Sequence, residues 1–113
     1  MKGYGIVDQI GEAAALEQLA EEATELSKAA LKLARIVRRE NPTPVDFDTA
    51  FRAFLEELGD TRLCANVLQD KYGPLDTREH EERRLKRWKY RLMAFYHGPA
   101  DGRKATPEQE QPL

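Results

Sequence analysis

Two acidic clusters, with the sequences EEATE and EELGD, stand well apart in this chain. Each holds a pair of carboxylates three residues apart, Glu22 with Glu25 and Glu57 with Asp60. Side chains three apart on an α-helix share one face of that helix. Two such helices packed side by side bring four carboxylates together. A group of this kind away from water requires a hard divalent cation, for which Mg²⁺ is the usual occupant. The spacing therefore predicts a metal site.

The helical projection separates these pairs from their acidic neighbours. At about 100° per residue, each pair lies beside an apolar face, where antiparallel helices meet, while Glu21 and Glu56 point elsewhere. Neither pair is followed four residues later by Lys or Arg, although Lys28 is placed to form a weak surface pair with Glu25. Solvated surface is the alternative interpretation of either pair taken alone.

Apolar periodicity defines the elements that must position these residues. The pattern predicts a short apolar helix within residues 1–11 and long helices over 12–39, 44–71 and 77–96. Thr43, followed by Pro44, is the expected N-cap of the second long helix, and Asp76 is the expected cap of the third.

No strand pattern is present in the sequence, so we predict an all-α fold. We expect an antiparallel helical bundle of three main helices plus a short N-terminal helix, completed by homo-oligomerisation. Residues 1–97 form the expected single domain, and residues 98–113 the expected flexible polar C-terminal tail. Leu63 and Val67 lie away from the main apolar face of the second long helix. A helix that is apolar on two sides is buried on two sides, which predicts a homodimer or a dimer of dimers.

Length and composition narrow the class of protein. A chain of 113 residues with a formal net charge of −2 suits one domain with one modest core. Cys64, near the acidic edge, is the only cysteine, which excludes an intramolecular disulfide and a thiolate metal site. No apolar run approaches the roughly 20 residues that span a membrane, and the N-terminus lacks a signal-peptide pattern. We expect a cytoplasmic protein without a membrane partner.

A di-iron centre in a helical bundle requires Glu-x-x-His motifs. His80 and His97 are preceded at that spacing by Thr77 and Ala94. The sequence therefore favours an all-oxygen site for a hard metal over redox iron.

The motifs are similar to those of a known family. EEATELSKAALK, which begins at Glu21, together with LEELGD, which ends at Asp60, resembles the MazG-like all-α nucleoside triphosphate pyrophosphohydrolases. The likeness extends from Leu16 to Leu92. It implies an oligomer of helical pairs that cleaves a nucleoside triphosphate to the monophosphate and pyrophosphate.

The same resemblance implies the roles of the carboxylates. Mg²⁺, with Mn²⁺ as a substitute, would be held by Glu22, Glu25, Glu57 and Asp60. Glu22 or Glu25 would instead orient or deprotonate the attacking water, and the sequence does not distinguish between them. The linker ENPTPVDFD departs from the wording of the family, and no motif fixes the preferred base.

The third long helix is rich in basic residues. Lys86, Lys89 and Arg91 are the candidates to contact a triphosphate, since a phosphate chain beside carboxylates needs cationic partners. A solvated basic face is the alternative. Trp88 lies in the apolar face of this helix and is expected in the core, with stacking on a base as the alternative.

Two other functional classes remain open at this stage. A non-catalytic helical adaptor or regulatory protein would keep the bundle and use its acidic edges for protein contact. A nucleic-acid binder would use the basic residues between Arg83 and Arg91, but the acidic first half repels phosphates and no recognition motif is visible. We therefore expect no stable nucleic-acid partner.

Overall fold

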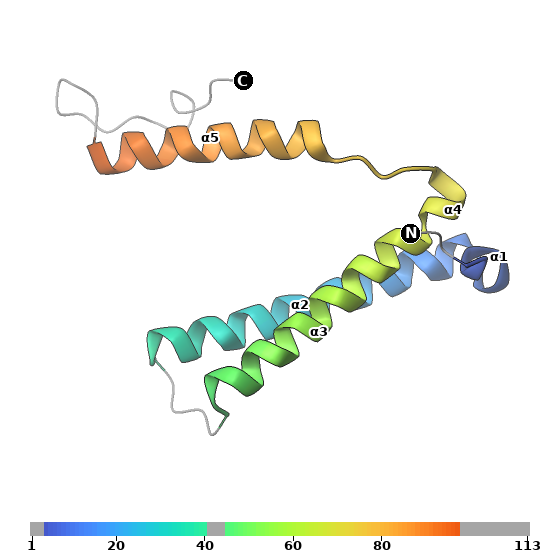
Figure 1. Ribbon diagram of the computed structural model, residues 1–113, viewed down its shortest axis with the longest axis horizontal. Coiled ribbons are helices and arrows are strands. Elements are labelled where there is room, and N and C mark those ends of the chain that lie inside the picture. Colours follow the sequence, from blue (N-terminus) through green and yellow to red (C-terminus); the bar gives the residue numbers. More distant parts are fainter. Residues whose placement is uncertain (1–3, 41–44, 98–113) are drawn as a thin grey trace. The chain divides into compact units, whose positions relative to one another are not determined.

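The computed structural model describes residues 4–40 and 45–97. Within these ranges the chain forms five helices and no strand, which confirms the all-α prediction. The helices are α1 (Ile6–Ile10), α2 (Glu12–Arg38), α3 (Phe47–Val67), α4 (Gln69–Tyr72) and α5 (Arg78–His97) (Figure 1). None of the described helices is both long enough and apolar enough to cross a membrane.

The chain divides into two compact units, Met1–Leu75 and Asp76–Leu113. The first contains α1 to α4, and the second contains α5. The single domain expected over residues 1–97 stays a prediction, and the tail expected at 98–113 lies outside the described residues.

The two long helices α2 and α3 run antiparallel and lie side by side (Figure 1). Helix α2 ends at Arg38, as the periodicity predicted, because Arg39 adopts a left-handed conformation with φ of 58°. The cap expected at Thr43 was wrong. Asp46 is the N-cap of α3, where its carboxylate accepts a hydrogen bond of 2.8 Å from the backbone N–H of Thr49. Thr43 and Pro44 lie outside the described residues.

The second long helix was expected to continue to about Lys71, but it breaks at Leu68. This residue separates α3 from α4 and is only 2% exposed. Polar contacts tie α4 to the beginning of the chain. The carboxylate of Asp70 accepts a hydrogen bond from the backbone N–H of Gly5 at 3.1 Å, and the Tyr72 hydroxyl donates to Glu12 at 2.5 Å. The break therefore allows the end of the hairpin to close onto α1 and the start of α2.

The core of the first unit lies at this closed end. Val7 of α1, Ala15 of α2, Val67 of α3 and Leu68 form one buried cluster, against which Leu19 packs. The expectation that Val67 needs a second copy for its burial was therefore wrong, because the cluster with α1 and α2 already covers it. Helix α1 helps to bury Val67, a role that the sequence analysis gave to a second copy of the chain.

Large apolar side chains remain exposed elsewhere on the hairpin. Leu63 is 45% exposed, and the exposed aromatic and aliphatic residues of α3 also include Phe47, Phe51 and Leu55. The rings of Phe47 and Phe51 stack with their centroids 5.7 Å apart. This surface is compatible with homo-oligomerisation, which stays a prediction.

The second unit contains the basic helix α5. Trp88, expected in the core, is 54% exposed, and the guanidinium of Arg84 lies over its ring, 5.4 Å from the centroid. Contact with a cation of its own helix is thus the interaction that the structure shows for this ring.

We expect Leu68→Ala to destabilise the first unit strongly. The substitution leaves a cavity in the small buried cluster and should lower the free energy of unfolding by about 2–5 kcal/mol. Urea unfolding at a fixed protein concentration measures the change. Leu75→Ala is the matched control, because Leu75 is 43% exposed. Equal losses for the two variants would contradict the burial assigned to Leu68.

Candidate metal centre

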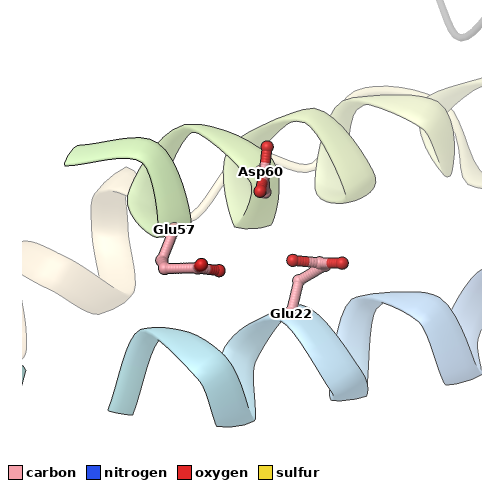
Figure 2. Close-up of side chains that lie close together, drawn as sticks. All are labelled: Glu22, Glu57 and Asp60. Carbon is pink, nitrogen blue, oxygen red and sulfur yellow. The ribbon is translucent and has the colours of Figure 1, made fainter. Parts of the chain in front are cut away.

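The antiparallel pairing of α2 and α3 brings three of the predicted ligands together. Glu22 of α2 and Glu57 and Asp60 of α3 each offer a carboxylate oxygen, and these oxygens all lie within 4.8 Å of one another. Figure 2 shows Glu22 and Glu57 pointing toward each other across the space between the two helices, with Asp60 beside them. Glu22 and Glu57 are half-buried and Asp60 is exposed. This group can hold a metal ion.

Local helical structure explains the arrangement. Glu57 and Asp60 are three apart on α3 and therefore share a face. On α2, the amide Nε2 of Gln18 donates a hydrogen bond of 2.9 Å to Oε1 of Glu22. Residues four apart meet on a helix surface, so this bond directs the Glu22 carboxylate from within its own helix. The sequence analysis did not identify this role, although Gln18 and Glu22 stand four residues apart in the chain.

Glu57 is a carboxylate of the group whose pKa is shifted. Partial burial raises the pKa of this carboxyl, and the negative charges of Asp60, Glu22, Glu25 and Glu56 raise it further. A cation between them would replace this repulsion by attraction.

The three oxygens lie within 4.8 Å of one another. A six-coordinate Mg²⁺ bound by all three would require them to approach further, because neighbouring ligand oxygens on such an ion lie about 3 Å apart. The ligand set is all oxygen. Burial raises the pKa of the neighbouring Cys64 thiol, and the charges of Glu22 and Asp60 add to the rise. The group of neighbouring ligand atoms among the described residues does not include the Cys64 sulfur.

Glu25, the fourth predicted ligand, is not part of this group. Its Oε1 lies 3.4 Å from Nζ of Lys28, and both side chains are more than half exposed. This contact is the weak surface pair expected from the sequence. Glu25 nevertheless lies close enough for its charge to raise the pKa of Glu57. It is one helical turn from Glu22, at the margin of the site.

The three basic candidates lie on α5, in the second unit. Lys86 and Lys89 are exposed, and Arg91 is half-buried. Their contact with a triphosphate stays a prediction.

Gly59 lies between Glu57 and Asp60 in the interior of α3. A Cβ built on Gly59 meets no heavy atom of the described chain within 4 Å. Packing among the described residues therefore does not require a glycine here.

Comparisons of the chain with protein-family models, with curated proteins and with solved structures found no match. The resemblance to the MazG-like proteins rests on the residues quoted above and stays a prediction.

We expect Glu57→Gln to stabilise the metal-free protein at neutral pH. A carboxyl with a raised pKa binds its proton more tightly in the folded chain, so its contribution to stability is present below the ordinary pKa of 4.5 and is lost as pH rises through the folded value. The glutamine amide does not ionise, so the variant does not lose this stability. In a chelator, the variant should unfold at a higher temperature than the wild type, and its unfolding temperature should depend less on pH above 4.5. With saturating Mg²⁺ the order should reverse, because only the wild type gains a full set of ligands.

Glu21→Gln is the matched control for this experiment, since Glu21 is an exposed carboxylate of the same charge on α2. An equal rise for both variants would show that net charge, rather than repulsion within the group, sets the midpoint.

We expect Gly59→Ala to raise the free energy of unfolding by about 0.5–1 kcal/mol, because alanine has the higher helix propensity and the space for its methyl group is open. Urea unfolding tests this directly. A lower stability in the variant would reveal a close contact at Gly59 from outside the described chain, such as a second copy.

Proposed function

We propose that this protein is a Mg²⁺-dependent nucleoside triphosphate pyrophosphohydrolase. In the proposed reaction, one water cleaves the bond between the α- and β-phosphoryl groups of a nucleoside triphosphate and yields the monophosphate and pyrophosphate. The observation that carries the proposal is the group of carboxylate oxygens from Glu22, Glu57 and Asp60, all within 4.8 Å of one another between two antiparallel helices. The sequences of both acidic motifs resemble those of the MazG-like enzymes. This resemblance connects the carboxylate group with that reaction.

The carboxylates divide into two roles. Glu22, Glu57 and Asp60 would hold the metal, and the Gln18 amide donates a hydrogen bond to Glu22. When bound, Mg²⁺ would neutralise charge on the phosphates and on the leaving pyrophosphate and would lower the pKa of a bound water. Glu25, one turn from Glu22, orients the attacking water and accepts its proton. To do so, its side chain leaves Lys28 and turns toward the other carboxylates.

Two further elements complete the proposal. Lys86, Lys89 and Arg91 of α5 supply positive charge to the triphosphate. The protein acts as a homodimer or a dimer of dimers, which is supported by the exposed apolar side chains of α3, including Phe47 and Phe51.

The same exposed residues favour one alternative, a non-catalytic adaptor that binds another protein. In that case the carboxylate group would be a solvated acidic edge without a metal. Activity and metal binding decide between the two proposals.

We expect Asp60→Asn to lower kcat by about two to three orders of magnitude, because the metal supplies several kcal/mol of transition-state stabilisation and this variant loses one charged ligand. Pyrophosphate release from a panel of nucleoside triphosphates with Mg²⁺ measures the rate, and calorimetry measures Mg²⁺ affinity. Glu56→Gln is the matched control, since it removes a charge from an exposed residue of the same helix outside the group.

A folded wild-type protein that binds no Mg²⁺ and releases no pyrophosphate from any member of the panel would overturn the enzyme proposal and leave the adaptor. Equal activity in wild type and Asp60→Asn would move the site elsewhere.

A further inference from the structure

Helix α5 carries an apolar face. At about 100° per residue, Leu85, Trp88, Leu92 and Phe95 fall on one side of this helix. Each of these side chains is between 45% and 62% exposed. No other described helix belongs to the second unit, so none within that unit covers the face. A contiguous apolar surface of this kind is a candidate binding surface.

Basic residues surround this apolar face. From Arg83 to His97 the sequence contains no Asp or Glu. By the same projection, Arg84, Lys89 and Arg91 lie along the two margins of the apolar face. The remaining basic residues of this stretch, which project away from the face, are Arg83, Lys86 and Arg87.

The acidic residues of α5 are confined to its beginning. Glu79, Glu81 and Glu82 precede the basic stretch, and acidic side chains near a helix N-terminus interact favourably with the helix dipole. Glu81 projects onto the apolar side one turn before Leu85, so the apolar face begins at Leu85. From Leu85 to Phe95 the helix is therefore both cationic and amphipathic.

This pattern is complementary to the surface of an anionic bilayer. A polar face rich in Lys and Arg, with Trp, Phe and Leu on the other face, is typical of helices that lie in the plane of a bilayer surface. At the margins, long basic side chains reach the lipid phosphates while their methylene groups cover apolar surface. Arg84 shows this arrangement already, since its guanidinium lies over the Trp88 ring, 5.4 Å from the centroid.

The apolar face distinguishes a bilayer from a nucleic acid as the partner. A nucleic acid attracts the same basic residues through its phosphates, but it leaves Leu85, Leu92 and Phe95 in water. A bilayer surface takes up both faces of the helix, because anionic headgroups and acyl chains meet at the same depth.

We propose that α5 docks this protein on the surface of an anionic phospholipid bilayer, with its apolar face at the boundary between headgroups and acyl chains. A helix in the plane of the surface does not span the membrane, so the proposal agrees with the absence of a spanning helix among the described residues. It departs from the expectation of no membrane partner, which rested on spanning segments. The proposal is independent of the proposed function, since none of the three clustered carboxylates lies on α5.

Flotation of the full chain tests the proposal, with vesicles of phosphatidylcholine alone and of phosphatidylcholine mixed with phosphatidylglycerol. We expect about tenfold or tighter binding to the anionic vesicles, because each basic residue near such a surface adds roughly a fivefold gain. Added salt should weaken this binding. Trp88 is the only tryptophan of the chain, so its fluorescence reports on α5 and should shift to shorter wavelengths on binding.

The apolar face is tested by Leu92→Gln, which we expect to weaken vesicle binding by about tenfold. Leu31→Gln is the matched control, because Leu31 is an exposed leucine of α2, and it should bind as the wild type does. Circular dichroism checks folding, and Leu85→Gln tests the same face if Leu92→Gln does not fold.

The basic face is tested by the double variant Arg83→Gln and Arg84→Gln, since Lys86, Lys89 and Arg91 are assigned above to a triphosphate. We expect this variant to weaken vesicle binding by about tenfold or more. Its matched control is the double variant Lys32→Gln and Arg62→Gln, which removes the same charge from exposed residues of the first unit and should bind nearly as the wild type does.

A folded protein that binds neither kind of vesicle, or both equally, would overturn the proposal. Wild-type binding by Leu92→Gln and Leu85→Gln would do the same. Tighter binding to duplex DNA than to anionic vesicles, unchanged in Leu92→Gln, would assign the basic residues to nucleic acid instead. Asp60→Asn should bind vesicles as the wild type does while it releases pyrophosphate slowly, so the failure of either proposal is visible without the other.

Discussion

Packing of α1 against the start of α2 and the end of α3 sets the register of the first unit. The buried cluster of Val7, Ala15, Val67 and Leu68 lies at one end of the hairpin, and the hydrogen bond between Asp70 and Gly5 closes that end. Two stiff helices that are fixed together at one end have their facing residues determined for several turns beyond it. The positions of the carboxylates follow from this contact. The placement of the carboxylate group therefore depends on a small core to which none of the three carboxylates belongs.

The carboxylate group lowers the stability that this core provides. Glu57 is half-buried among other negative charges, and the rise of its pKa is the sign that the ionised form is unfavourable there. A protein with so small a buried cluster has little stability to spare for repulsion. A cation at this position would remove this repulsion, and its binding would then be coupled to folding through the same three side chains.

The sequence predicted the paired helices and the proximity of three of the four candidate carboxylates, Glu22, Glu57 and Asp60, because periodicity determines which faces of two paired helices meet. Their role as metal ligands stays a prediction. Prediction from the sequence failed where the outcome depends on tertiary contact. The break at Leu68 carries no glycine or proline signal and arises from burial at the closed end of the hairpin. The N-cap of α3 is Asp46 and not Thr43. Both are good capping residues a few positions apart, so the sequence does not distinguish between them. Glu25 has a rotamer directed at Lys28, which projection along a helix axis does not reveal.

The short helix α1 has only five residues and joins α2 through Gly11, whose φ of 95° is a conformation that glycine adopts readily. Its Ile6 and Ile10 line a small apolar cavity together with residues of α2 and α3, and α1 holds none of the three carboxylates. Substitutions in α1 can therefore reshape one wall of this cavity while the paired helices that carry the acidic motifs keep their sequence.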